Sequence, residues 1–194
     1  MDTAVVILAA GKGTRMNSNR PKVMHEIGNF PMLYHCIKTA HQINPSKVIT
    51  VIGHGRTEIK QYLQNSKKPI EFVIQEEQLG TGHAVKIATN QLSNFDGNLI
   101  VMFGDTPFIS YETLIKIEAK CEQTDLVVLG FRAEDPIGYG RLITNSTELL
   151  KIVEHNDAND DEIAVNLCNS GVMAGNSLLL SLIHISEPTR RKRI

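Results

Sequence analysis

Short runs of apolar residues alternate along this chain with segments in which apolar residues recur every three or four positions. The near-continuous apolar runs occupy residues 4–8, 48–52, 70–74, 99–103 and 126–129. Such runs are typical of parallel strands that are covered on both faces. The segments between them have the spacing of amphipathic helices. This alternation predicts successive strand, helix and strand units with right-handed crossovers.

Two of the intervening segments carry signals for the start of a helix. Asn29 is a candidate N-cap for a helix with Pro31 in its first turn, and Ser110 could cap a second helix. The predicted apolar face of the first helix consists of Leu33, Cys36, Ile37 and Ala40. That of the second consists of Leu114, Ile117 and Cys121. We therefore expect both helices to pack against the predicted sheet.

The pattern changes from about Gly138. Shorter strand-like segments follow at 138–143, 148–154 and 166–175, and a polar, acidic turn near Asp157 separates the last two. We therefore expect an α/β fold, with a doubly wound and mostly parallel sheet and a smaller mixed-sheet region that completes a cleft.

Composition and charge narrow the class of protein. The 194 residues are 42% hydrophobic and 21% charged, with a formal net charge of −1, as expected of one domain or one domain with an appendage. This balance gives no global field for nucleic acid or a membrane surface, and no apolar run approaches the roughly 18 residues of a membrane span. The three cysteines lack a C-x-x-C spacing, which favours reduced, buried thiols. We expect a cytoplasmic protein with no nucleic-acid or membrane partner.

The loop after the first predicted strand, LAAGKGTRMNSNRPK at 8–22, combines glycines with four basic residues. Glycines let the backbone approach a ligand closely, backbone N–H groups can cradle phosphate oxygens, and Lys and Arg offset their charge. A glycine turn alone is often structural, and a basic run alone is often a solvated surface. Their combination directly after a buried strand favours phosphate binding.

Two further loops follow predicted strands and are expected at the same sheet edge, where ligands of such sheets bind. Asp105, after Gly104, could hold Mg²⁺ together with substrate phosphates, or it could cap the turn into Pro107. In the other loop, Gln75 carries an amide that can pair with the edge of a nucleobase, and the glycines around Thr81 let a flat base lie against backbone. No residue in these loops is placed to act as a nucleophile.

Six motifs in this order resemble the uridylyltransferase domain of the bacterial GlmU family. These are LAAGKGTRM at 8–16, PKVMHEIGNFPML at 21–33, QLGTGHA at 78–84, FGD at 103–105, GYGR at 138–141 and IVEH at 152–155. That family comprises bifunctional N-acetylglucosamine-1-phosphate uridyltransferases and glucosamine-1-phosphate acetyltransferases. The resemblance, over roughly residues 4–180, implies a Rossmann-like nucleotide-diphospho-sugar transferase fold. It also implies cytoplasmic synthesis of UDP-N-acetylglucosamine for peptidoglycan of the cell wall and for lipopolysaccharide.

The resemblance implies a role for each matching residue. The catalytic residues would be Arg15 and Lys22, which hold the triphosphate, and Asp105, which binds Mg²⁺. The nucleotide would be surrounded by Leu8, Ala9, Ala10, Gly11, Phe103 and Gly104, and its uracil read by Gln75, Gly80 and Thr81. The sugar would contact Gly140, Glu154 and Asn169. The implied reaction joins UTP and N-acetylglucosamine-1-phosphate to give UDP-N-acetylglucosamine and pyrophosphate.

The chain also departs from the family's pattern. We expect a nucleotidyltransferase domain at 1–180 that is incomplete at its C-terminal end, followed by a tail at 181–194 of artefactual origin. The family's second Mg²⁺ ligand, an asparagine in a later segment, has no counterpart, because Gly175 and Asn176 are expected at the start of a helix. The acetyltransferase half that makes the family trimeric is not matched either.

Three interpretations therefore remain open from the sequence. The first is a Mg²⁺-dependent uridylyltransferase. The second is a non-catalytic fragment that binds a nucleotide sugar. The third is a related sugar- or alcohol-phosphate nucleotidyltransferase that uses another nucleoside triphosphate.

Overall fold

The computed structural model describes residues 1–13, 16–146, 148–177 and 180. The chain divides into two compact units. The first unit consists of Met1–Val127 and the described residues from Ala174 onward, and the second consists of Val128–Met173. The expected tail at 181–194 lies outside the described residues.

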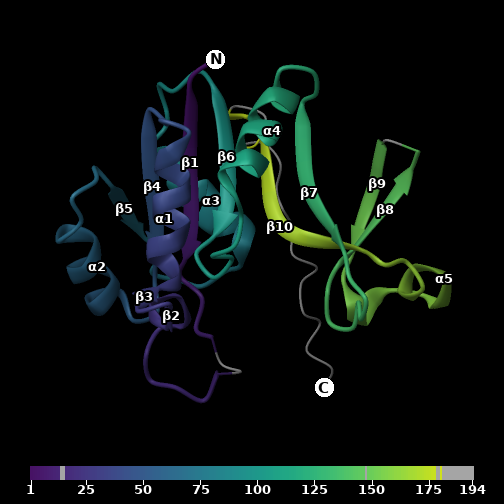
Figure 1. Ribbon diagram of the computed structural model, residues 1–194, viewed down its shortest axis with the longest axis horizontal. Helices are drawn as coiled ribbons and strands as arrows, with labels where there is room; N and C mark the ends of the chain where they lie inside the picture. The colour runs from purple at the N-terminus through teal and green to yellow at the C-terminus, as the bar shows by residue number, and fades with distance from the viewer. Residues whose placement is uncertain (14–15, 147, 178–179, 181–194) are drawn as a thin grey trace. The chain divides into compact units, whose positions relative to one another are not determined.

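A mostly parallel sheet forms the centre of the first unit (Figure 1). Its strands are β5 (Glu71–Ile74), β4 (Lys47–Ile52), β1 (Thr3–Ala9), β6 (Asn98–Phe103) and the end of β10 (Leu167–Asn176), in that order. The backbone N–H of Ser177, directly after β10, donates to the carbonyl of Gly97, directly before β6, so β10 runs antiparallel to β6. The central strand β1 pairs in parallel with both β4 and β6, and β4 pairs in parallel with β5. All seven residues of β1 are buried, as the continuous apolar run predicted.

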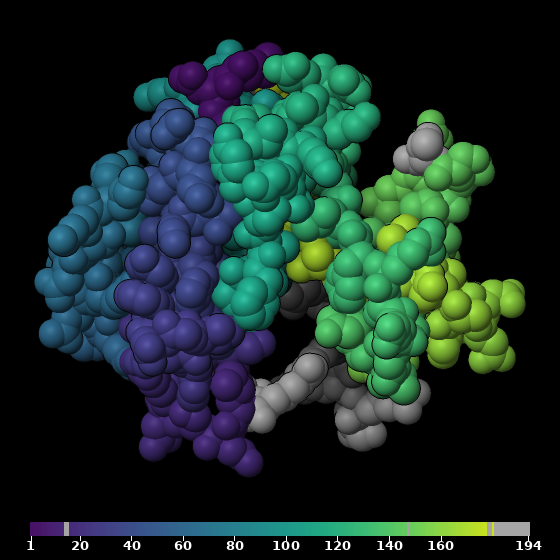
Figure 2. All heavy atoms as spheres, in the orientation of Figure 1, coloured from purple at the N-terminus to yellow at the C-terminus, as the bar shows by residue number. Residues whose placement is uncertain are grey.

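Helices cover both faces of this sheet. They are α1 (Met32–Gln42), α2 (Arg56–Gln64), α3 (Thr81–Asn90) and α4 (Tyr111–Cys121). Figure 1 shows α1 in front of the sheet and α3 behind it. On the front face α1 contacts α4, and their surfaces meet in Figure 2. The doubly wound α/β fold predicted from the sequence is confirmed for this unit.

The two predicted helix starts had different outcomes. Ser110 caps α4 as expected, and its hydroxyl accepts a hydrogen bond from the backbone N–H of Thr113 at 3.2 Å. Asn29 does not cap α1. Instead it lies in the two-residue turn of a short hairpin with φ 68°, and Pro31 occupies the N-cap position. The hairpin strands are β2 (Glu26–Ile27) and β3 (Phe30–Pro31), and a short 3-10 turn, η2 (Lys22–Met24), precedes them.

The second unit is a small, mostly antiparallel sheet. It contains β8 (Arg141–Asn145), β9 (Glu148–Val153), most of β7 (Leu126–Arg132) and the first part of β10. Strand β8 pairs antiparallel with β9 and with β10, and β7 also pairs with β10. This is the smaller sheet region expected after Gly138.

Two local predictions for this part of the chain were wrong. The acidic segment near Asp157 is not a plain turn, because it forms η3 (His155–Asp157) and the short helix α5 (Asp160–Ile163). Asn159 and Glu162 close a capping box there, with backbone N–H to side-chain oxygen distances of 3.0 and 2.9 Å. Gly175 and Asn176 were expected to begin a helix, but both lie in strand β10.

Among the described residues, every helix is too short or too polar to cross a lipid bilayer.

Candidate functional site

A cavity of about 240 Å³ lies in the first unit at the carboxyl ends of its parallel strands. The chain passes from β1 to β4 and β5 on one side and then to β6 on the other, so β1 and β6 flank the point where the winding reverses. Open α/β sheets bind ligands at this point, because the loops after the two strands diverge and leave a crevice.

Most of the predicted nucleotide-binding residues line this cavity. They are Leu8, Ala9, Ala10, Gly11, Lys22, Gln75, Gly80, Thr81 and Phe103. Gly104 and Asp105 follow Phe103 directly, and the backbone N–H of Gly104 donates to the carbonyl of Leu8 at 2.9 Å. Arg15, the remaining predicted catalytic residue, lies outside the described residues. The structure therefore brings together three loops that are up to about 95 residues apart in the sequence.

The cavity also has lining residues to which the sequence analysis gave no role. They are Gly13, Val23, Gln78 and Ala84. All four lie inside the motifs that carried the family resemblance, so membership of those motifs was the available signal. Gly13 has φ 59°, and a Cβ there would lie 2.8 Å from the Cβ of Lys22. Glycine at this position therefore lets the opening loop pass closely over Lys22.

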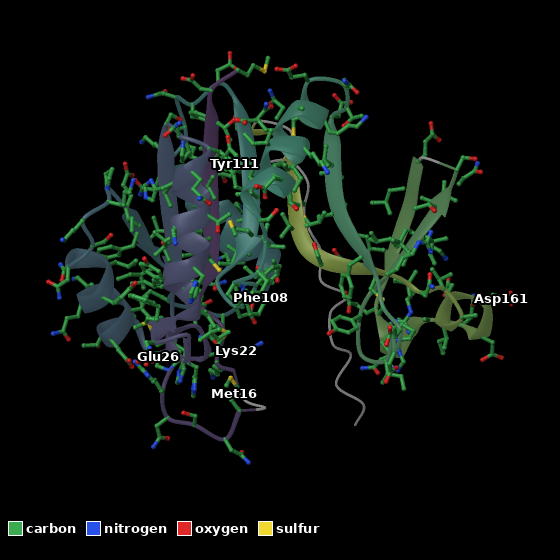
Figure 3. The ribbon with its side chains drawn as sticks, viewed as in Figure 1. Met16, Lys22, Glu26, Phe108, Tyr111 and Asp161 are labelled. Carbon is green, nitrogen blue, oxygen red and sulfur yellow. The ribbon has the colours of Figure 1, made fainter. Side chains whose placement is uncertain are left out.

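Lys22 and Asp105 form an ion pair beside the cavity. The Lys22 ammonium lies 2.5 Å from one carboxylate oxygen of Asp105, and the two side chains are 42% and 26% exposed. Figure 3 places Lys22 at the end of the first unit where the parallel strands finish. Both groups can still reach a ligand, because neither is buried. The arrangement sets a cation and a carboxylate side by side where phosphates and a metal ion were predicted.

The donor set at this edge fits Mg²⁺ held partly by substrate. Within the described ranges, no three His, Cys, Asp or Glu side chains cluster in a way that could enclose a metal. Mg²⁺ commonly takes one or two protein carboxylates and completes its shell with water and phosphate oxygens. The half-buried carboxylate of Asp105, which already holds one cation, suits that mode of binding.

Two further side chains, those of Cys36 and Arg20, have structural roles rather than roles in binding. The thiol of Cys36 donates to the carbonyl of Phe103 at 3.4 Å, and burial raises its pKa to about 12. It is therefore protonated near neutral pH and is not a nucleophile. Arg20, part of the basic loop, is held at the surface by Glu58 at 2.9 Å and Glu26 at 3.4 Å. Lys22, rather than Arg20, is the cation that reaches the cavity.

Two glutamine side chains are fixed at the cavity wall by their amide nitrogens. Gln75 is 4% exposed, and its Nε2 lies 3.1 Å from the carbonyl of Gly80 and 3.1 Å from Nδ1 of His83. Nε2 of Gln78 donates to the carbonyl of Ala10 at 2.8 Å. Both amides are therefore held in one orientation beside the cavity.

The three residues predicted to contact a sugar lie together in the second unit. The backbone N–H of Asn169 donates to the carbonyl of Gly140 at 2.8 Å. A Cβ on Gly140 would lie 3.2 Å from a carboxylate oxygen of Glu154, so this carboxylate lies close to the Gly140 backbone. The side-chain oxygen of Asn169 accepts from the N–H of Gly171 at 2.9 Å, so its NH₂ group is not used in this bond.

Arg141, to which the sequence analysis assigned no role, supports these three residues. Its side chain is completely buried, donates to the carbonyl of Tyr139 and lies 3.4 Å from Nδ1 of His155. Tyr139 directly precedes Gly140, and His155 directly follows Glu154. The guanidinium thus links the segment just before β8, which contains Gly140, to the segment that carries Glu154.

Substituting Arg141 with lysine should lower the free energy of unfolding by about 1–3 kcal/mol, because an ammonium cannot span both partners of the planar guanidinium. Arg132→Lys is the matched control. Arg132 is exposed and donates to the side-chain oxygen of Asn166 at 2.7 Å, so the substitution should change stability by less than about 0.5 kcal/mol. Urea unfolding measures both variants. Equal losses in the free energy of unfolding would show that the bonds of the buried Arg141 stabilise the protein no more than the exposed bond of Arg132 does.

Comparison with known proteins agrees with the fold. The MobA-like NTP transferase domain matches residues 5–164. The bifunctional protein GlmU of Ruegeria sp. strain TM1040 is 49% identical over 177 residues, which make up 91% of this chain and 39% of that protein. This chain therefore spans about two fifths of the length of that relative.

Solved structures with the same fold include two bacterial proteins. One, from Bacillus anthracis, is classed as a glucose-1-phosphate thymidylyltransferase and gives a TM-score of 0.79 at 19% identity, covering 99% of this chain and 78% of its own. The other, HddC from Yersinia pseudotuberculosis, gives a TM-score of 0.74 at 26% identity, with 92% and 78% covered. These likenesses confirm the Rossmann-like nucleotide-diphospho-sugar transferase fold that the sequence motifs implied.

Proposed function

The chain belongs to the MobA-like NTP transferase domain family, and from this premise we propose that it transfers a uridylyl group from UTP to N-acetylglucosamine-1-phosphate. The products are UDP-N-acetylglucosamine and pyrophosphate, and the reaction depends on Mg²⁺. In the cell this cytoplasmic reaction would supply the activated sugar for peptidoglycan and lipopolysaccharide. The identity to GlmU supports this choice of substrates among those used within the fold.

The observation that carries the proposal is the cavity at the β1 and β6 strand ends with the Lys22–Asp105 pair beside it. A nucleoside triphosphate needs a slot for its base, backbone and cations for its phosphates, and an oxygen ligand for its metal ion. The cavity provides the fixed amides of Gln75 and Gln78, the glycine-containing loop after β1, the ammonium of Lys22 and the carboxylate of Asp105.

The chemistry we propose is a single direct displacement. A phosphate oxygen of the sugar phosphate attacks the α-phosphorus of UTP, and the bond from that phosphorus to the oxygen bridging to the β-phosphate breaks. The electron pair leaves with pyrophosphate. No covalent intermediate with the protein is needed, which agrees with the high pKa of the Cys36 thiol, about 12. Catalysis then consists of positioning and of offsetting negative charge.

Each group at the nucleotide site has a role in that step. The ammonium of Lys22 offsets charge on the phosphates, a role in which we also place Arg15. The carboxylate of Asp105 holds Mg²⁺, which neutralises phosphate charge and orients the triphosphate when bound. The backbone from Leu8 to Gly11 packs against the nucleotide, and the amide of Gln75 recognises the base.

In the second unit, Gly140, Glu154 and Asn169 would hold the acceptor sugar. The carboxylate of Glu154 accepts hydrogen bonds from sugar hydroxyls, and the NH₂ group of Asn169 donates one. The arrangement supports this assignment, because the carboxylate of Glu154 lies close to the Gly140 backbone, whose carbonyl accepts from the N–H of Asn169 at 2.8 Å.

Pyrophosphate release from UTP and N-acetylglucosamine-1-phosphate tests the proposal. With Mg²⁺ we expect turnover that stops when the sugar phosphate is omitted or when the metal ion is chelated. Glucose-1-phosphate, which lacks the acetamido group, and CTP and GTP serve as matched substrate controls. Faster turnover with another nucleotide would replace the uridylyl assignment. Binding of UDP-N-acetylglucosamine without any pyrophosphate release would overturn the transfer reaction and leave a nucleotide-sugar-binding role.

A further inference from the structure

The side-chain amide of Gln75 can take one orientation at the cavity wall. One end of the amide lies 3.1 Å from the carbonyl oxygen of Gly80. A carbonyl oxygen only accepts hydrogen bonds, so this end must be the NH₂ group. An oxygen placed there would face the Gly80 oxygen with no proton between them.

His83 completes this arrangement from the first turns of α3. Its Nδ1 lies 3.1 Å from the same Nε2 of Gln75, so the second N–H of the amide points at the ring. Because the amide nitrogen can only donate, Nδ1 is the acceptor of this hydrogen bond. Gly80 and His83 together use both protons of the amide. The oxygen Oε1 is left for the cavity that Gln75 lines.

We propose that His83 is a positioning residue that holds the Gln75 amide with its oxygen toward the cavity, so that the site selects a nucleobase with a ring N–H. This inference rests on the proposed function in taking the ligand to be a nucleotide, and it adds the reason for the choice of base. Uracil carries a proton on N3 and can donate to Oε1. Cytosine has an unprotonated N3, which would face Oε1 with two lone pairs opposed.

The second anchored amide points to the same selectivity. Nε2 of Gln78 is used by the carbonyl of Ala10 at 2.8 Å, so its oxygen is also the free end. Gln78 lines the same cavity as Gln75. Two acceptors at one wall favour a base edge that donates, because a base edge that accepts would leave the oxygen of the buried Gln75 amide unpaired.

The experiment measures the dissociation constants of UTP and CTP by titration calorimetry on the full chain with Mg²⁺. For the unchanged protein we expect UTP to bind at least about 10-fold more tightly than CTP. His83→Leu removes the acceptor and frees the amide to turn, so the ratio should fall toward one. His83→Asn keeps an acceptor oxygen near the place of Nδ1 and should preserve most of the ratio. Lys86→Met, at an exposed position of the same helix, should change nothing.

The outcomes separate this inference from the proposed reaction. A UTP to CTP ratio near one in the unchanged protein, or an unaltered ratio in His83→Leu, overturns the role of His83. The first of these needs no variant and holds even if His83→Leu fails to fold. If UTP binds clearly more tightly than CTP but no pyrophosphate is released, the role of His83 stands and the proposed transfer reaction is overturned. Failure of both nucleotides to bind overturns both.

Discussion

Replacing Asp105 with asparagine should lower the rate of pyrophosphate release by at least about 100-fold while the protein stays folded. Asparagine has the same shape but lacks the negative charge that holds Lys22 at 2.5 Å and that we propose holds Mg²⁺. The ion pair itself contributes only about 0.2–1 kcal/mol to stability, because both side chains are partly exposed. Activity and stability should therefore respond very differently.

The same strand provides the matched control. Asp96 precedes β6 and Asp105 follows it, so the two carboxylates lie at opposite ends of one buried strand. Asp96 is exposed, and Asp96→Asn should leave both turnover and the urea midpoint unchanged. Raising the Mg²⁺ concentration should partly restore Asp105→Asn, because the amide oxygen is a weaker ligand for the ion. Turnover in Asp105→Asn equal to that of the unchanged protein would remove Asp105 from the mechanism.

The central sheet could be predicted because its signal is local and strong. Strands fully covered by helices need near-continuous apolar runs, and β1, β4 and β6 carry them. Once the strands and their alternation with helices are known, the loops at their carboxyl ends follow, and with them Lys22, Gln75 and Asp105.

The short hairpin before α1 was missed because its signal is weak. Strands β2 and β3 have two residues each, too few for any periodicity. The sign of the turn was the Gly28–Asn29 pair, whose φ angles of 60° and 68° both lie in the left-handed region. Asn29 was instead interpreted as a helix cap, since asparagine is favoured in both settings.

The contacts between side chains could not be predicted from the sequence, for a different reason. Lys22 and Asp105 were each predicted as site residues, yet their direct pairing depends on how three loops converge. Burial of Arg141 was not predicted either, because an arginine in a glycine-rich motif looks exposed until the neighbouring strands are placed. The hydrogen bond from Gln75 to His83 depends in the same way on the path of the 75–83 loop.

The substitution with the largest expected effect on stability is Gly55→Ala, beside the nucleotide loop. Gly55 is the N-cap residue of α2 with φ 67°, and a Cβ there would overlap the ring of Pro21. The left-handed backbone alone costs a residue other than glycine about 1 kcal/mol, and overpacking adds about 1–3 kcal/mol. We expect a total loss of about 2–4 kcal/mol in the free energy of unfolding. Turnover should also fall, because Pro21 directly precedes Lys22 and moves with it.

Gly28→Ala separates the two causes of that loss. Gly28 has nearly the same backbone angle, φ 60°, but no atom lies within 4 Å of a Cβ built there. It should therefore show the backbone cost of about 1 kcal/mol alone, with turnover unchanged. Urea unfolding and pyrophosphate release on both variants measure the difference. If Gly55→Ala were no more damaging than Gly28→Ala in either assay, the packing of Pro21 on Gly55 could not be what holds Lys22 in place. The position of the Lys22 ammonium would then have to depend on its contacts with Gly13 and Asp105.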